Sequence, residues 1–540
     1  RQLPTNCSGR SGCRWWGNRF AREILRRCSC QQGAIRSINP TTMDSEETPV
    51  ARRRSQPRET GRRKPLFFWV AAALVLLVAL SVGITDPSRR HHLQSLVSSL
   101  SSSHRILSLV RKQRAAPTTR PRGPISGRPP CVLWMAPFVS GGGYSSEAWS
   151  YITALDRNMR REGPRIRLAI EQHGDLENLE FWEGLPEGDK ELAFRLHSTE
   201  CELPETVVVC HSEPGAWHPP LFQTLPCPPA GYEGPLAVVG RTMFETDRVD
   251  PEHVRRCNRM DAVWVPTGFH VSTFARSGVL PSKVAKVVQP VDVEFFDPAK
   301  HDPLVLPAGR PVLGSLSGHP DASSRGKDFI FLSVFKWERR KGWDVLLRSF
   351  LREFSAGDGV ALYLLTNPYH SDGDFEGKVS RFAEEDVELT EPGGGWAPVY
   401  VMGTHIPQVE LPRLYRAADA FVLPSRGEGW GRPLVEAMAM GLPVIATNWS
   451  GPTEYLTEEN GYPLRVERMS EVAEGPFKGH LWAEPSMDEL RVLMRRVVSN
   501  PEEAKRRAGR AREDMIRRFS PDVVARLVVD EILKVSNTDR

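Results

Sequence analysis

The chain has 540 residues, of which 40% are hydrophobic and 25% are charged; this composition is typical of globular proteins, and the length exceeds that of one domain. The formal net charge of +5 comes from residues 1–42, which hold eight arginines and one acid, whereas the remainder has 63 basic and 65 acidic residues. This near-neutral balance lacks the positive charge typical of nucleic-acid-binding proteins, so we expect no nucleic-acid partner.

Residues 1–42 differ from the rest of the chain. They contain four of the nine cysteines and show no hydrophobic periodicity, and Met43 is the first methionine. We expect translation to start at Met43, so that 1–42 is upstream sequence that is not translated. An arginine-rich transit peptide is the alternative.

An uncharged apolar segment follows at Leu66–Ile84, and its 19 residues are enough to cross a bilayer. Seven basic residues precede it in 43–65, which by the positive-inside rule keeps the N-terminus in the cytosol. A signal peptide cleaved after the small residues Ser81 and Gly83 is the alternative. We expect a cytosolic basic tail (43–65), a transmembrane signal anchor and a stem (85–130), the layout of a single-pass type II membrane protein of the Golgi or another secretory-pathway compartment with its body in the lumen.

From Cys131 onward, short apolar runs alternate with helix-like stretches, which is the pattern of βα units on a parallel sheet. The predicted strands are Cys131–Met135, Ile166–Ile170, Thr206–Cys210, Ala237–Val239, Ala262–Val265 and Ala285–Val288, then Phe329–Val334, Ala361–Leu365, Val399–Met402, Ala420–Leu423 and Pro443–Ala446. We expect an α/β fold with two Rossmann-like domains, 131–303 and 328–500. A linker rich in Gly, Pro and Ser (304–327) separates them, and charged helices (501–540) follow.

The first domain begins with a strand followed by SGGGYSSEAW, so that Gly141, Gly142 and Gly143 precede a helix. Their N–H groups suit a phosphate, although a plain tight turn is the alternative. His211 comes directly after the run VVVC, at the strand end where α/β proteins bind ligands. A histidine packed in the interior is the alternative there. Arg241, Glu245 and Asp247 are weaker candidates for the wall of a cleft.

The second domain begins with FIFLSVFKWERRKGW, which places Lys336, Arg340 and Lys341 after a strand. A solvated basic turn is the alternative. Further on, RGEGWGRPLVEAMAMGLPVIATNWSGPTEYL places Glu428 and Glu436 eight residues apart, across a glycine-rich turn that leads into a helix. The glycines permit close approach of a ligand, and the helix N-terminus favours phosphate.

This last string, with its E-x7-E spacing and the following NGYPL, resembles the nucleotide-binding half of retaining glycosyltransferases of family 4. Those enzymes have the GT-B fold, in which two Rossmann-like domains face each other across a cleft. The resemblance is strong in the second half and loose in the first. It implies transfer of a sugar from a UDP- or GDP-linked donor with retention of configuration and without a metal or cofactor. The acceptor, whether a glycan, a lipid or a small molecule, stays open.

The resemblance also implies roles for individual residues. Lys336, Lys341 and the start of the helix at 432–434 hold the diphosphate, and Arg340 assists because Lys336 stands where the family has Arg. Glu436 binds the ribose and Glu428 the sugar. The implied catalytic residues are Glu428, Lys341, Lys336 and His211. The implied donor-binding residues are Glu436, Gly429, Gly431, Arg432, Pro433, Leu434, Arg340, Gly403, Ile406, Gly141, Gly142 and Gly143. In the family the last helix crosses back onto the first domain, as we expect for Ser520–Val535.

Other classes stay open at this point. A non-catalytic protein that binds sugar or nucleotide is the main alternative, although the intact Glu428, Glu436 and Lys341 disfavour it. A nicotinamide-dependent oxidoreductase is disfavoured because no G-x-G-x-x-G fingerprint is present. A phosphorylase-like enzyme of GT-B architecture lacks an identifiable cofactor lysine site. The five cysteines after residue 130 leave at least one thiol unpaired within the chain, and their pairing cannot be read from the sequence.

Overall fold

The computed structural model describes residues 129–229, 231–306, 310–314, 328–368, 372–403 and 406–537. The upstream segment 1–42, the predicted tail and the predicted membrane anchor all lie outside these residues. Within the described ranges, no helix is both long enough and apolar enough to span a bilayer.

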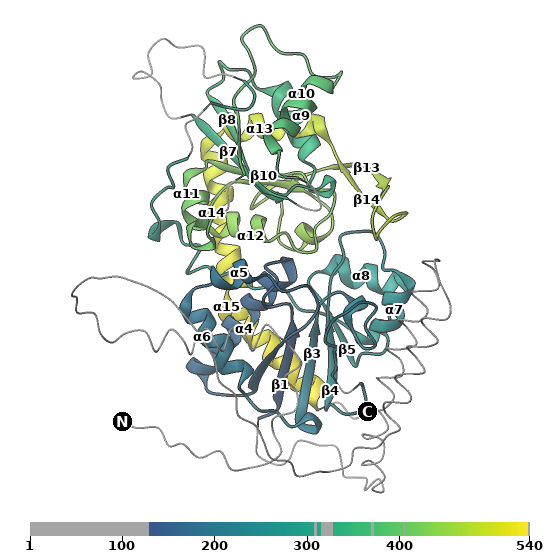
Figure 1. Ribbon diagram of the computed structural model, residues 1–540. Helices are drawn as coiled ribbons and strands as arrows, with labels where there is room; N and C mark the ends of the chain where they lie inside the picture. The colour runs from purple at the N-terminus through teal and green to yellow at the C-terminus, as the bar shows by residue number, and fades with distance from the viewer. Residues whose placement is uncertain are drawn as a thin grey trace, which may run out of the picture. The chain divides into compact units, whose positions relative to one another are not determined.

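The first half is built on a sheet of six parallel strands in the order β2-β1-β3-β4-β5-β6. The strands are β1 (Cys131–Ala136), β2 (Arg167–Gln172), β3 (Thr206–His211), β4 (Ala237–Arg241), β5 (Ala262–Val265) and β6 (Val284–Lys286). The helices are α4 (Gly143–Glu162), α5 (Leu179–Glu183), α6 (Glu187–His197), α7 (Pro251–Cys257) and α8 (Gly268–Ser277). Figure 1 shows helices on both faces of this sheet.

The second half repeats the plan with six parallel strands in the order β12-β11-β10-β7-β8-β9. The strands are β7 (Phe329–Lys336), β8 (Val360–Asn367), β9 (Val399–Met402), β10 (Ala420–Leu423), β11 (Val444–Thr447) and β12 (Tyr462–Leu464). The helices are α9 (Trp343–Glu353), α10 (Phe375–Glu385), α11 (Leu411–Ala417), α12 (Arg432–Ala439), α13 (Met487–Ser499) and α14 (Pro501–Phe519). An antiparallel hairpin, β13 (Val466–Glu471) and β14 (Leu481–Pro485), stands apart from the sheet.

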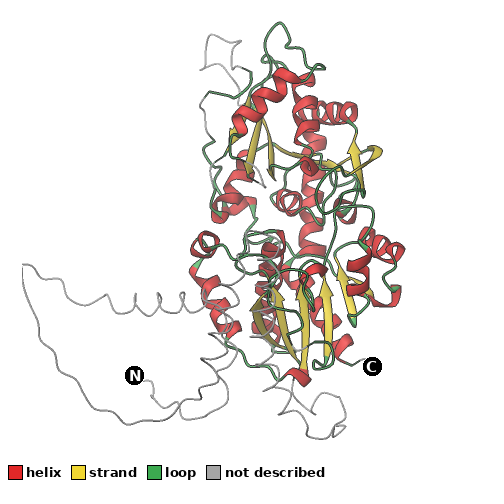
Figure 2. Ribbon diagram, turned by 45° about the vertical axis from the view of Figure 1, so that its right-hand side comes forward, coloured by secondary structure: helices red, strands yellow, loops and turns green. Residues whose placement is uncertain are grey.

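Burial explains why the strands form where the apolar runs predict them. All six residues of β3 are buried, as are the first seven residues of β8. Strands covered by helices on both faces read as continuous apolar runs rather than as alternating patterns. Figure 2 shows the strands flanked by helices in this way. The predicted α/β class with two parallel sheets is therefore confirmed.

The last helix, α15 (Pro521–Ser536), packs against α4 of the first half. Its buried face includes Val528 and Ile532, which are fully or almost fully inaccessible to solvent. Three ion pairs join the two helices and the segment that follows α4, at Arg161–Asp522 (2.6 Å), Arg165–Asp530 (2.9 Å) and Arg526–Glu162 (3.1 Å). Because such exposed pairs contribute little, the apolar face of α15 supplies most of the stabilisation.

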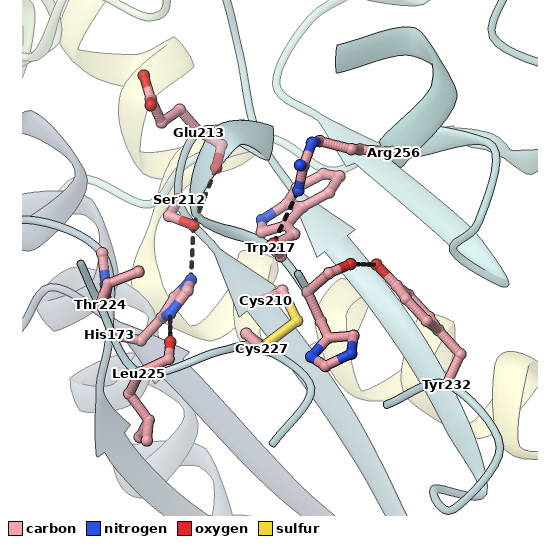
Figure 3. Close-up of a disulfide and its surroundings, with 12 residues drawn as sticks. His173, Cys210, Ser212, Glu213, Trp217, Thr224, Leu225, Cys227, Tyr232 and Arg256 are labelled. Atoms are coloured by element: carbon pink, nitrogen blue, oxygen red, sulfur yellow. Dashed lines mark hydrogen bonds between the residues drawn. A yellow bond between two sulfur atoms is a disulfide. The ribbon is translucent and has the colours of Figure 1, made fainter. Parts of the chain in front are cut away.

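Two disulfides stabilise the first half, Cys131–Cys201 and Cys210–Cys227. The second closes a loop of 17 residues that leaves the end of β3 (Figure 3). Cys257 is the free cysteine of the described residues, and it is buried. The structure thus supplies the pairing that the spacing of the cysteines left open.

The contribution of α15 can be tested with Ile532→Ala. Removing this buried side chain should lower the apparent free energy of unfolding by about 2–5 kcal/mol, since it leaves a cavity between α15 and the core. Chemical denaturation followed by circular dichroism measures the change. Lys534→Ala on the same helix is the control, because the Lys534 side chain is 71% exposed, and it should change stability by less than about 0.5 kcal/mol. Equal effects of the two substitutions would contradict the packing role of α15.

Candidate functional site

The glycine-rich turn between β10 and α12 lies directly against the first half. A Cβ on Gly427 would collide with the backbone oxygen of Glu245, and a Cβ on Gly429 would lie 2.6 Å from the sulfur of Met243. Gly431 precedes α12 with a φ of 90°, a conformation that favours glycine. The glycines of this turn therefore allow a contact between the two halves that no larger residue permits.

The basic turn after β7 lies beside the glycine-rich turn. Lys341 donates from Nζ to both carboxylate oxygens of Glu428, at 2.7 and 2.8 Å. Arg340 donates to the backbone oxygen of Gly427 and to Oε1 of Glu338, both at 2.6 Å. Two turns from different strands are thus joined by charged hydrogen bonds at the carboxyl edge of the second sheet.

Glu428 is nearly buried, with 6% of its side chain exposed. Burial alone acts to raise the pKa of Glu428, but the positive charges of Lys341 and Arg340 outweigh it and lower the pKa below its usual value. The backbone N–H of Glu428 donates to Oγ of Ser450 at 2.9 Å. Glu428 is therefore an ionised carboxylate held in a fixed position.

Glu436 lies in the first turns of α12 and is also buried. Its Oε2 accepts a hydrogen bond from the hydroxyl of Tyr415 at 3.0 Å, and its Oε1 lies 3.6 Å from the guanidinium of Arg432. Burial raises the pKa of Glu436, although Arg432 and Tyr415 act to lower it. Pro433 and Leu434 complete this first turn, with Pro433 where a missing N–H costs nothing.

Side chains of the first half reach the same region. Arg432 donates to Oγ of Ser150 on α4 at 3.4 Å, and Arg340 lies 3.9 Å from Oε1 of Glu245. Burial raises the pKa of Glu245, while the charge of Arg340 acts to lower it. Asp247, by contrast, faces the β13–β14 hairpin, where its carboxylate accepts from the N–H of Leu481 at 2.7 Å.

The glycines before α4 lie beside Asp175. Gly142 precedes the helix, and its N–H donates to Oγ of Ser140 at 3.2 Å. Gly141 has a φ of 71°, and space beside Gly143 is open. A carboxylate oxygen of Asp175 lies 3.2 Å from the position that a Cβ on Gly142 would occupy. Burial raises the pKa of Asp175, and the charge of Lys336 from the second half acts to lower it.

His211 is not brought to an accessible position, because the structure buries it completely. Its Nδ1 accepts a hydrogen bond from the indole of Trp134 at 3.0 Å, so its Nε2 carries the proton and faces Oε2 of Glu147 at 3.0 Å. Arg241 donates to the other oxygen of Glu147 at 2.8 Å and to the backbone oxygen of Val287. His211 and Arg241 thus hold Glu147 inside the first half, beneath the carboxyl edge of its sheet.

Gly403 and Ile406 flank residues 404–405, which lie outside the described residues. Gly403 is exposed and Ile406 is half-buried. The structure therefore brings Lys341, Glu428 and Arg340 into direct contact. Of the two residues predicted beside the base, Gly403 directly follows β9 and Ile406 lies further along the chain.

Two residues of this region were missed by sequence reasoning. Tyr415 lies in α11, where nothing in its neighbourhood marks it as a partner of Glu436. Ser450 adopts a φ of 58°, unusual for a residue other than glycine, and accepts from Glu428. The string SGPTEYL contains Ser450, so its position next to the E-x7-E segment was the available signal.

Comparison with known proteins gives a family for the second half. Residues 326–475 match the family model described as glycosyl transferases group 1. This segment is a glycosyl transferases group 1 domain. It contains Lys336, Lys341, Glu428 and Glu436, the residues that carry the resemblance.

Sequence relatives and a solved structure of other glycosyltransferases also resemble this chain. The chain is 28% identical over 224 residues to D-inositol 3-phosphate glycosyltransferase 1 of Catenulispora acidiphila, covering 42% of this chain and 45% of that protein. It is 45% identical over 69 residues to O-antigen chain mannosyltransferase B of Escherichia coli, covering 12% of this chain and 17% of that protein. The chain thus spans less than half the length of these curated relatives. A glycosyltransferase from Rickettsia africae has the same fold, with a TM-score of 0.50, 14% identity and coverage of 76% of this chain and 100% of that one.

The predicted location in a Golgi or other secretory-pathway membrane is wrong. The two curated relatives are bacterial transferases and not Golgi type II proteins. The described helices also offer no bilayer-length apolar span. In α14, for example, alanines, Met515 and Phe519 are buried between exposed charges. The segment predicted as an anchor, 66–84, lies outside the described residues.

The buried carboxylate of Glu147 predicts a pH dependence. Burial acts to raise its pKa, but Arg241 and His211 lower it from its usual 4.5 to about 2. A depressed carboxylate pKa stabilises the fold above pH 4.5, and this stabilisation is lost as the pH falls towards 2. Glu147→Gln should therefore cost about 3–5 kcal/mol at pH 7, since it leaves Arg241 buried without its counter-charge.

The difference in stability between the native protein and Glu147→Gln should shrink steadily below pH 4.5. Thermal melting of both proteins at a series of pH values from 7 to 3 measures it. Glu187→Gln is the matched control, because the Glu187 side chain is 79% exposed. A difference that stays constant with pH would contradict an ionised Glu147.

Proposed function

We propose that the protein is a glycosyltransferase that moves a sugar from a nucleoside-diphosphate sugar to an acceptor. The observation that carries this proposal is the contact of Lys341 with Glu428, beside the N-terminus of α12. It joins a cation suited to phosphate and a carboxylate suited to sugar hydroxyls within one family-matched domain. The relatives of the chain, a mannosyltransferase and a D-inositol 3-phosphate glycosyltransferase, support the same reaction class.

In this proposal the donor diphosphate binds at the N-terminus of α12, where the positive end of the helix dipole favours anions. Lys336, Arg340 and Lys341 add positive charge. Their charge stabilises the nucleoside diphosphate as it leaves, because fixed charges in a partly buried site need little reorganisation. The charge that the leaving group needs therefore comes from side chains, and we propose that the reaction needs no metal and no cofactor.

In this proposal Glu428 changes its hydrogen-bond partner when the donor binds. In the structure both of its oxygens accept from Lys341. When phosphate oxygens take over Lys341, Glu428 becomes free to accept hydrogen bonds from hydroxyls of the donor sugar. Binding of the donor thereby replaces one contact, between Lys341 and Glu428, with two: Lys341 with phosphate and Glu428 with sugar hydroxyls. The second contact needs the sugar, which favours binding of the complete nucleotide sugar over the nucleotide alone.

Glu436 is the proposed ribose ligand. Tyr415 occupies one of its oxygens and Arg432 lies beside the other, which fixes the orientation of the carboxylate. Each carboxylate oxygen has further acceptor capacity, so two adjacent ribose hydroxyls can donate to it. UDP and GDP both satisfy this requirement, and the base would lie near Gly403 and Ile406.

Retention of configuration is part of the proposal, with the acceptor attacking from the side on which the diphosphate leaves. The acceptor then lies between the donor sugar and the first half, near Gly141–Gly143. His211 does not act on substrate in this scheme. It positions Glu147 and the end of β3 instead, which replaces the catalytic role predicted from its place in the sequence.

Donor hydrolysis tests the proposal. The protein is incubated with a panel of UDP- and GDP-sugars, and release of the nucleotide is measured. Glu436→Gln should lower kcat/KM by about tenfold to a hundredfold, since it weakens charged hydrogen bonds to the ribose. Lys341→Ala should lower kcat by about 10²–10³, since it removes charge from the leaving group.

Glu459→Gln is the matched control, because it is the same substitution in the same domain at a side chain that is 77% exposed. Its activity should equal that of the native protein. If no donor is hydrolysed and calorimetry detects no nucleotide binding, the proposal fails. Binding of a nucleotide sugar without any turnover would instead favour the non-catalytic binding protein.

A further inference from the structure

Five large apolar side chains are exposed on two segments of the first half, the loop that leads into the start of α5 and the loop that follows β3. We call them the apolar platform: Leu176, Leu179, Leu221, Phe222 and Leu225. Leu176 is 87% exposed and Leu221 is 58% exposed. Single exposed apolar residues are ordinary, but a group of them on neighbouring loops marks a surface for binding.

The two loops are held together by several contacts. His173 is buried, and burial lowers its pKa to about 4, so the ring is neutral. Its Nδ1 faces the backbone oxygen of Leu225 at 2.6 Å and its Nε2 faces Oγ of Ser212 at 2.8 Å (Figure 3). The N–H of Gly174 donates to Oγ1 of Thr224 at 2.9 Å. The platform is therefore formed before any ligand arrives.

The disulfide Cys210–Cys227 closes the second loop at its base, as Figure 3 shows. Within the loop, the N–H of Leu221 donates to the backbone oxygen of Gly215 at 2.8 Å. Arg256 donates to the backbone oxygen of Trp217 at 2.8 Å. A loop with this many fixed points keeps its apolar side chains exposed because they cannot turn inward.

The platform borders the candidate functional site. Oε1 of Glu213 and Cδ1 of Leu221 both lie within 3.6 Å of the position that a Cβ on Gly215 would occupy. Burial raises the pKa of Glu213, and the charges of Asp175 and Glu245 raise it further. Glu245 in turn lies 3.9 Å from Arg340 of the basic turn. Glu213 beside Leu221 and Glu245 beside Arg340 thus interact electrostatically, which connects the platform with the proposed diphosphate site.

The charges of the two loops indicate the kind of ligand. Residues 173–183 and 211–226 contain no lysine or arginine. Their acids are Asp175, Glu177, Glu180, Glu183 and Glu213. An anionic membrane surface attracts basic segments and repels acidic ones, so these loops are unsuited to it. An uncharged apolar group with a hydroxylated head fits both the leucines and the carboxylates, which accept hydrogen bonds from hydroxyls.

We propose that the acceptor is an amphiphile with an uncharged apolar tail, which lies on the platform, and a hydroxylated head, which the carboxylates Asp175, Glu213 and Glu245 orient towards the donor sugar. This assignment rests on the proposed transferase function, since it names the substrate class that the first half supplies to the same reaction. The tail contributes affinity through burial of apolar area, and the head provides the hydroxyl that receives the sugar.

The test uses the full chain with methyl, butyl and octyl β-D-glucoside as probes, each below its micelle concentration. Calorimetry should show an affinity that rises with tail length, by roughly tenfold to a hundredfold from methyl to octyl. The double substitution Leu221→Ser/Phe222→Ser should abolish this dependence on tail length. Leu176→Ser should weaken it without loss of folding, because the Leu176 side chain is exposed.

Leu280→Ser is the matched control, because Leu280 is 50% exposed but lies outside the platform, and it should leave the dependence on tail length intact. Thermal melting verifies that each variant is folded. An affinity that is independent of tail length in the native protein overturns the proposal. So does an equal loss of the dependence in Leu280→Ser.

Vesicles of phosphatidylcholine, with and without phosphatidylserine, distinguish a dispersed amphiphile from a membrane. The proposal predicts no co-sedimentation with either vesicle, and binding that Leu221→Ser/Phe222→Ser removes would assign the platform to a lipid surface instead.

Donor hydrolysis by the native protein distinguishes failure of the amphiphilic-acceptor proposal from failure of the transferase proposal. Hydrolysis without dependence on tail length rejects the amphiphilic acceptor alone. Dependence on tail length without hydrolysis of any donor supports the platform but rejects the transferase.

Discussion

The ion pair between Lys341 and Glu428 is the interaction on which the arrangement of the site depends. Each partner ends a turn that leaves a different strand of the second sheet, so the pair fixes the two turns relative to each other. Gly342 makes the approach possible, because a Cβ at this position would collide with the backbone oxygen of Pro424. Two charges this far from solvent each need a partner, so in the absence of a donor neither turn can move without exposing or isolating a charge.

The fold was largely predictable from the sequence, because strands that are buried on both faces require continuous apolar runs. β5, β9 and β10 have the predicted bounds. The β13–β14 hairpin was not predictable, since VERMSE is half-buried to exposed and is held by contacts with residues far away in the chain, such as Asp247. Local patterns carry no record of a partner that lies more than two hundred positions earlier.

The residues of the site also divide into those that could be predicted from the sequence and those that could not. Glycines, lysines and glutamates of the second half were identified because their spacing within one turn reflects their chemistry directly. Tyr415 and Glu147 were not identified, since each matters only through a contact with a residue of another element. His211 is buried, which was one of the two environments that its place in the sequence left open. A residue at the end of a strand points either to solvent or under the neighbouring helix, and α4 with its Glu147 decides the second outcome here.

The return of α15 onto α4 has a consequence for the order in which the protein is made. Domains generally fold as they leave the ribosome, the N-terminal one first. The first half of this chain cannot do so completely, because one of its covering helices, α15 with Val528 and Ile532, is synthesised after the whole second half. Until then α4 presents an uncovered apolar face. The first domain is therefore completed only after the second half has been made, and removal of α15 would leave both sheets in place but α4 uncovered.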